Sequence, residues 1–200
     1  MTRPEDLTQR QGDATSIGGS GAGIEPLVRL PSARQFAQGL ALLRGFLGLV
    51  FLFNGLAKLL NIHAVLIGPY VANLITRDDT RFILNVEANK NARHSLPGIR
   101  ALVNDVFLPH FGFWQYVFTA AELGIGLLLV LGLASRLGAL LALLQTGFLA
   151  ALYFGNDRWV FEQPLEVVPL LILLWIPSGR VWGADGSRLV PLPLRGRWPF

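Results

Sequence analysis

The sequence predicts an all-α protein of the membrane, a polytopic four-helix bundle with a long extramembrane loop between its first and second helices. Hydrophobic residues make up 52% of the 200 residues and charged residues only 15%, whereas soluble domains carry about 25% charged residues. Four apolar segments recur along the chain, at 40–60, 113–133, 137–154 and 160–176. Buried helices of a soluble protein would leave too little polar sequence to cover four such segments.

Each segment has the length of a membrane span or comes close to it. As a helix, 40–60 would extend roughly 31 Å, the thickness of the hydrocarbon core of a bilayer. Only three residues, 134–136, separate the second and third segments, so we expect an antiparallel helical hairpin there. The segment 160–176 is the shortest and contains two prolines.

The predicted spans divide the chain into a polar tail at 1–39, a membrane domain at 40–190 and a C-terminal tail at 191–200. The first tail includes a run rich in Gly and Ser, which favours a flexible segment. The loop at 61–112 is too long to lack structure of its own. After Pro97, apolar residues recur at helical spacing up to Phe107, which predicts a short helix, either on the membrane surface or docked as an ordinary loop helix.

The charge pattern predicts an orientation and excludes several classes of function. Basic residues gather on the side of the two termini, so the positive-inside rule places both termini in the cytoplasm and the protein in the cell (inner) membrane. The 17 basic residues form no run, which argues against binding of nucleic acid. With no cysteine, the chain has no disulfide or thiol chemistry. The three histidines show no metal-ligand spacing, so we expect no metal site.

Polar residues within the first span fall on one helical face. This face carries Arg44, Gly55 and Lys58, and small or polar residues favour contact between membrane helices. We therefore expect it to point into the bundle. For Arg44 we favour a side chain that extends along the helix to water near the end of the span.

Glu122 lies near the middle of the second span, about 13 Å from its start at 1.5 Å per residue. A carboxylate within a membrane is costly and favours a functional role, so Glu122 is a candidate proton relay. A structural alternative is a hydrogen bond from Glu122 to Asn54 or Gln145, which should lie at similar depth. The sequence leaves both readings open.

Two further carboxylates stand four residues apart at the start of the fourth segment. Glu162 and Glu166 share a helical face at a depth similar to that of Lys58. We expect one of them to pair with Lys58.

Several of these residues together resemble the DoxX family, particularly its DoxD-like branch. The resemblance covers about 40–190 and rests on LRGFLGLVFLFNGLAKLL, then FTAAELGIGLLLVLGLASRLGALLALL, then VWGADGSRL. It implies a small four-helix membrane protein in which Arg44, Gly55, Lys58, Glu122 and Arg136 match the family pattern. The DoxD-like branch is associated with thiosulfate:quinone oxidoreductase, in which it works with a separate DoxA subunit.

Two main functional hypotheses remain open, the second of them suggested by the size of the 61–112 loop. In the first, the chain is the membrane subunit of a quinone-linked oxidoreductase, and Asn54, Lys58 or Gln145 binds a quinone carbonyl; without cysteine, thiosulfate chemistry would need another subunit or direct reaction at the quinone. In the second, the chain is a non-catalytic scaffold or anchor that binds a partner subunit through the 61–112 loop. A small transporter is a third reading, which the lack of a recognisable repeat disfavours. Whether the chain is itself an enzyme stays open.

Overall fold

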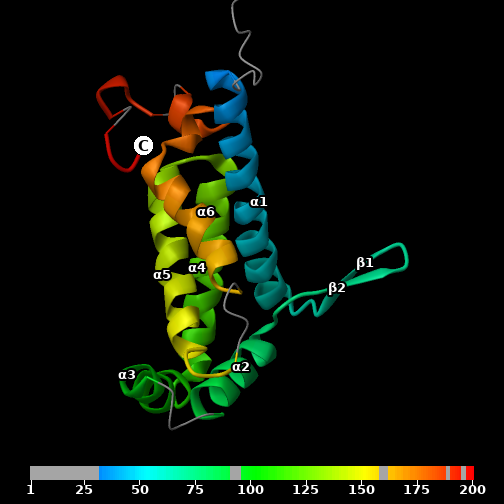
Figure 1. Ribbon diagram of the computed structural model, residues 1–200. Coiled ribbons are helices and arrows are strands. Elements are labelled where there is room, and N and C mark those ends of the chain that lie inside the picture. The colour runs from blue at the N-terminus through cyan, green and yellow to red at the C-terminus, as the bar shows by residue number, and fades with distance from the viewer. Residues whose placement is uncertain (1–31, 91–95, 158–161, 188–189, 195–196) are drawn as a thin grey trace, which may run out of the picture. The chain divides into compact units, whose positions relative to one another are not determined.

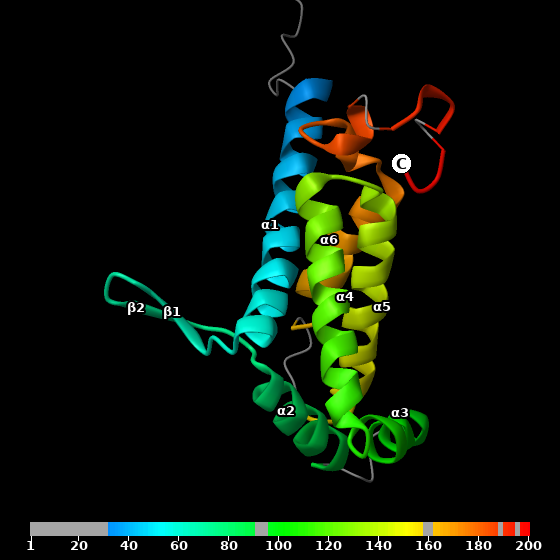
Figure 2. The same ribbon diagram turned by 180° about the vertical axis from the view of Figure 1, so that it is seen from behind.

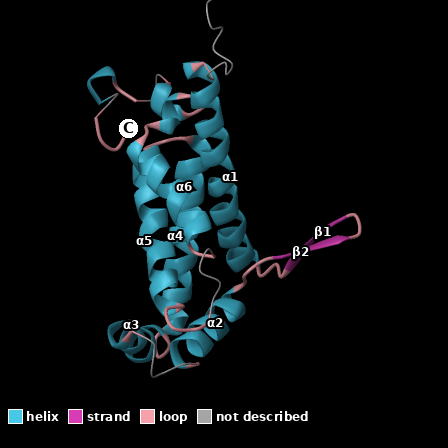
Figure 3. Ribbon diagram, in the orientation of Figure 1, coloured by secondary structure: helices cyan, strands magenta, loops and turns pink. Residues whose placement is uncertain are grey.

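The computed structural model describes residues 32–90, 96–157, 162–187, 190–194 and 197–200. This part of the chain is mostly helical, and its long helices pack side by side in a bundle (Figures 1 and 3). Most of the tail predicted at 1–39 and the start of the segment predicted at 160–176 lie outside the described residues.

Helix α1, Ala33–Leu60, begins before the predicted span. Ser32 caps its first turn, since its hydroxyl accepts a hydrogen bond from the Gln35 amide while the Gln35 side chain accepts one from the Ser32 amide. Such a reciprocal cap satisfies two amides that the first turn of a helix leaves without partners. The helix ends at Asn61, whose left-handed backbone stops the chain from continuing as a helix.

The second and third predicted segments form an antiparallel pair, as expected from their short link. They are α4, Phe111–Leu131, and α5, Ser135–Leu152. Among the described residues, α1, α4 and α5 are the helices long and apolar enough to cross a membrane. Helix α6, Pro164–Trp175, has 12 residues and extends only about 18 Å, so a fourth span over 160–176 stays a prediction.

Glycines bring α1 and α4 into close contact. A Cβ atom on Gly126 would lie 2.6 Å from the backbone nitrogen of Leu52, and one on Gly48 would lie 2.7 Å from the nitrogen of Val130. Helix α5 contacts both α4 and α6. The apolar core of the bundle comprises Leu47, Phe51, Ile125, Leu129, Ala139, Ala142, Leu170 and Leu173.

The long loop folds into helical elements and a β-hairpin. Helix α2, Arg77–Asn89, is followed by α3, Pro97–Ala101, and by the π-helical turn η2, Leu102–Phe107. These elements lie across one end of the bundle (Figure 1) and share with α4 and α5 a second core of Leu84, Ala88, Val103, Phe107, Phe111 and Leu152. The helix expected after Pro97 is therefore present, and it docks on the bundle.

A hairpin of two strands, β1, Ala64–Ile67, and β2, Tyr70–Asn73, connects α1 with α2. It projects sideways from the end of α1 (Figure 2). Short turns follow α6 at the opposite end of the bundle, near the start of α1 (Figures 1 and 2). They are η3, Ser178–Arg180, η4, Ala184–Gly186, and η5, Leu192–Leu194. The assignment of this end to the cytoplasm stays a prediction.

Candidate functional site

Lys58 and Glu122 form a buried ion pair between α1 and α4. The Lys58 Nζ lies 2.7 Å from Oε2 and 2.9 Å from Oε1 of Glu122. Only 3% of Lys58 and 7% of Glu122 are exposed. The prediction that this face of α1 points into the bundle is therefore confirmed for Lys58. Glu122 also points into the bundle.

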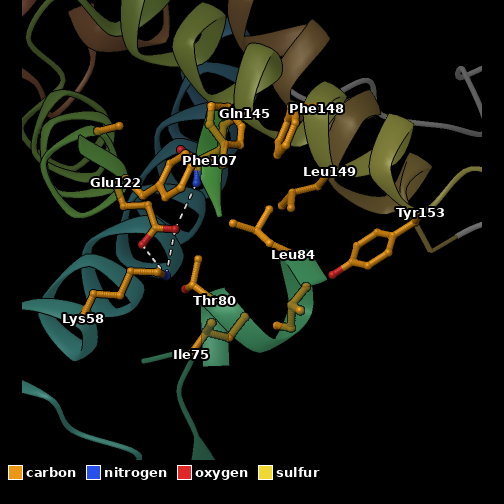
Figure 4. Close-up of a pocket in the computed structure, with 13 residues that line it drawn as sticks. Lys58, Ile75, Thr80, Leu84, Phe107, Glu122, Gln145, Phe148, Leu149 and Tyr153 are labelled. Atoms are coloured by element: carbon orange, nitrogen blue, oxygen red, sulfur yellow. Dashed lines mark hydrogen bonds and ion pairs between the residues drawn. The ribbon is translucent and has the colours of Figure 1, made fainter. Parts of the chain in front are cut away.

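Gln145 of α5 completes the cluster. Its Nε2 donates to Oε1 of Glu122 at 3.0 Å, so side chains from three helices meet at one carboxylate (Figure 4). The structural expectation of a hydrogen bond between Glu122 and Gln145 is confirmed. In the described part of the chain, Asn54 makes no hydrogen bond with Glu122, and its side chain is half-buried on α1.

The expected pairing of Lys58 with Glu162 or Glu166 is wrong, because Lys58 pairs with Glu122. The reason lies in the packing of α1 directly on α4. A Cβ atom on Gly55 would lie 2.9 Å from the backbone nitrogen of Leu123, so the two backbones come close beside the ion pair. Glu166 is exposed in the first turn of α6.

A cavity of about 260 Å³ adjoins this cluster. Lys58, Glu122 and Gln145 come together at one part of its lining, and Phe148, Leu149 and Tyr153 continue the lining along α5 and just past its end (Figure 4). The remaining lining residues are mainly apolar: Ile75, Thr80, Ile83, Leu84, Phe107, Phe118 and Ala121. We call this cavity the α2 pocket. An apolar space with a few polar groups on one wall is typical of sites for small lipophilic molecules.

The loop predicted at 61–112 supplies much of the wall. Its residues Thr80 and Leu84 come from α2 and Phe107 from η2. Sequence reasoning missed them, although α2 carries two recognisable signals. One is the Thr76 and Asp79 capping box at its start, and the other is the spacing of its pocket residues at 80, 83 and 84, which places them on one helical face.

Asn156, just after α5, holds α2 on the bundle. Its Nδ2 donates to the backbone oxygen of Glu87 at 2.7 Å and to Glu87 Oε2 at 3.0 Å. Both residues are buried. Helix α2, which forms part of the wall of the α2 pocket, is thus held in place by hydrogen bonds as well as by apolar contacts.

Arg44 occupies the opposite end of α1 and does not extend to water as expected. It is 2% exposed, and its Nη1 donates to the backbone oxygen of Ser178 at 2.6 Å and its Nη2 to that of Trp182 at 3.1 Å. The expectation failed because the backbone that follows α6 covers this end of the bundle. Arg44 therefore ties the C-terminal turns to α1.

Asp185 and Arg136 stabilise the same end. The Asp185 carboxylate accepts hydrogen bonds from the amides of Ala134 at 2.6 Å and Ser135 at 3.0 Å, which begin α5. Arg136 Nε donates to the backbone oxygen of Leu174 at the end of α6. These residues hold the helices together, and none of them lines the α2 pocket.

Comparisons with known proteins agree with the architecture. The DoxX family profile matches residues 39–155, which covers most of α1, the folded loop, α4 and α5. Comparisons with curated proteins and with solved structures found no match. Because the profile matches more than half of the chain, and because its helices are long and apolar enough to cross a membrane, the chain belongs to the DoxX family of membrane proteins.

Proposed function

We propose that this DoxX protein is the membrane subunit of an oxidoreductase complex linked to the quinone pool, and that the α2 pocket receives the quinone ring. The observation that carries the proposal is the combination of an apolar cavity with a buried lysine, carboxylate and amide on one wall. A quinone is itself an apolar ring with polar carbonyl groups, so it needs this kind of surface.

The residues present fit such a ring. Lys58 has three N–H donors and Gln145 has two, so each can donate to a ligand oxygen in addition to Glu122. Phe107, Phe118 and Phe148 line the remainder of the pocket and can pack on an aromatic or quinoid ring. Asn54, the third residue predicted to bind a quinone carbonyl, does not line the pocket. We therefore do not include it in the proposed site.

Bound quinone supplies the capacity to accept two electrons and two protons. In the proposed role, Lys58 and Gln145 orient a carbonyl oxygen, while Glu122 holds and releases a proton next to it. Glu122 suits this task because a carboxyl group exchanges protons and lies within hydrogen-bonding distance of both donors.

We assign the source of electrons to a partner subunit or to its substrate, because the chain has no cysteine. In the described residues, no group of three or more His, Cys, Asp or Glu side chains could hold a metal. Thiosulfate is the electron donor that the DoxD-like resemblance implies. A partner subunit would bind it.

The packing of the long loop favours this role over that of a scaffold. Helix α2 and η2 are docked on the bundle through Leu84, Ala88 and Phe107, and they form a wall of the pocket. The size of the loop is thus explained in part by the need to close a cavity.

The Glu122→Gln variant tests the proposal in the complex purified from native membranes. The amide keeps the size of the side chain and its oxygen can still accept a hydrogen bond from Lys58, which a leucine could not do, but it cannot exchange a proton at working pH. We therefore expect quinone reduction to fall by about 100-fold or more while the complex still assembles. Glu166→Gln is the matched control, since Glu166 is an exposed carboxylate outside the pocket. Full activity in Glu122→Gln would refute the proton role.

A further inference from the structure

The β1–β2 hairpin presents apolar side chains on both of its faces. Its register pairs Val65 with Ala72, Leu66 with Val71 and Ile67 with Tyr70. Since neighbouring residues of a strand point to opposite faces, one face carries Val65, Ile67, Tyr70 and Ala72, and the other carries Ala64, Leu66 and Val71, with the polar Asn73 at the base of the hairpin. A hairpin that rests on a protein core in water would have one polar face.

These side chains are exposed within the described structure. The exposed fractions are 74% for Leu66, 63% for Ile67, 66% for Tyr70 and 51% for Val71. An isolated hairpin of two strands is at best marginally stable in water, and contiguous exposed apolar residues mark an interaction surface. The hairpin therefore needs a partner that covers both faces.

The charge pattern indicates the chemistry of this partner. No Asp, Glu, Lys or Arg occurs between Lys58 and Arg77, whereas α2 begins with Arg77, Asp78 and Asp79. A stretch without charge that lies between charged residues suits an apolar environment next to water.

The hairpin is also continuous with the lipid-facing side of a spanning helix. Leu59 and Leu60, in the last turn of α1, are 53% and 60% exposed, and α1 is long and apolar enough to cross a membrane. Ile62, 38% exposed, continues this surface to Val65. The hairpin leaves α1 at the end of the span and runs sideways from the bundle (Figures 1 and 2).

We propose that the β1–β2 hairpin is a membrane anchor that inserts into the bilayer at the boundary between headgroups and acyl chains, on the side where α1 ends. This depth follows from the backbone, because the outer edges of a two-stranded hairpin have unpaired N–H and C=O groups that the hydrocarbon core does not tolerate. Tyr70 suits the same depth, where an aromatic ring with a polar end is favoured. The proposal does not depend on what the α2 pocket binds.

The absence of cysteine allows a direct test with single spin labels. The full chain carrying Leu66→Cys or Tyr70→Cys is labelled and placed in nanodiscs of phosphatidylcholine and phosphatidylglycerol. Collisions with oxygen, which enters lipid, are compared with collisions with a water-soluble nickel chelate. Leu144→Cys on α5, 64% exposed, is the reference for lipid, and Lys90→Cys, exposed at the end of α2, is the reference for water.

We expect the ratio of oxygen to nickel collisions at both hairpin positions to exceed that at Lys90 several-fold and to lie below that at Leu144, which is near the middle of the spanning helix α5. A ratio equal to that at Lys90 would place the hairpin in water and overturn the proposal. Low accessibility to both reagents would also overturn it, because a second copy or a partner protein would then cover the hairpin. Agreement between positions 66 and 70 guards against a local effect of one label.

Discussion

Lys58 and Glu122 are 64 residues apart in the sequence, yet the Nζ of Lys58 donates to both carboxylate oxygens of Glu122, at 2.7 and 2.9 Å. The pair joins the last turn of α1 to the middle of α4 and forms part of the wall of the α2 pocket. One contact thus contributes to the packing of the bundle and to the chemistry of its cavity. These two contributions can be separated by substitution.

The first prediction concerns the stability that the pair confers. Lys58→Met leaves a buried carboxylate without its cation, and Glu122→Leu leaves a buried ammonium, so each should destabilise the fold by about 3–5 kcal/mol. The double variant removes both charges and should be clearly more stable than either single variant. Unfolding in mixed detergent measures this. If the double variant loses as much free energy of unfolding as a single variant, or the sum of the two single losses, the two charges do not compensate each other.

The second prediction concerns the contact between α1 and α4. A Cβ atom at Gly126 would meet the backbone of Leu52 at 2.6 Å, whereas one at Gly124 meets nothing within 4 Å. Gly126→Ala should therefore cost about 1–3 kcal/mol through overpacking. Gly124→Ala on the same helix should be neutral or slightly stabilising. Similar unfolding curves for the two variants would contradict this packing.

The third prediction concerns the C-terminal turns. Asp185→Ala leaves the buried amides of Ala134 and Ser135 without their acceptor, at a cost of about 1–3 kcal/mol. Trypsin should then cut after the exposed Arg180 at least about fivefold faster, as this segment opens more often. Asp105→Ala, at an exposed position of η2, is the control. Unchanged cleavage in Asp185→Ala would mean that the carboxylate does not hold the segment.

The fourth prediction concerns the pH dependence of α2. Hydrogen bonds from the Thr76 hydroxyl and backbone amide lower the pKa of Asp79 below its usual range. The folded state therefore favours the ionised carboxylate, and its contribution is complete above the unfolded pKa of about 3.9. This stabilising contribution is lost as the pH falls through the lower pKa that Asp79 has in the folded state.

Hydrogen exchange in the first turn of α2 measures this effect. Below pH of about 4, exchange relative to Asp79→Asn at the same pH should rise as the cap is lost. In Asp79→Asn the cap has no titrating carboxylate, so only the intrinsic pH dependence of exchange should remain. The same pH profile in both proteins would contradict a role for the ionised cap.

The composition and helical spacing of the sequence were sufficient to predict the helical membrane architecture and one side of the site. The inward face of α1 follows from Arg44, Gly55 and Lys58 at helical spacing, since small and polar residues gather where membrane helices meet. Gln145 was predictable as a partner of Glu122 because the short link between α4 and α5 fixes their relative depth. Both predictions depend only on geometry along neighbouring helices.

The errors arose where distant segments meet. The partner of Lys58 depends on which helix lies beside α1, and depth alone does not distinguish Glu122 from Glu162 or Glu166. Arg44 bonds to backbone oxygens of the turns after α6, and such acceptors carry no side-chain signal in the sequence. The pocket residues of α2 were missed because nothing local shows that this helix docks beneath the bundle.

Photolabelling of the membrane-embedded protein with a photoreactive quinone tests the central claim most directly. The account predicts attachment to pocket residues such as Phe118 or Phe148, with loss of labelling when excess unmodified quinone competes. Attachment confined to lipid-facing positions such as Leu42, which is 65% exposed, and unaffected by competitor would contradict the assignment of the α2 pocket as a quinone site.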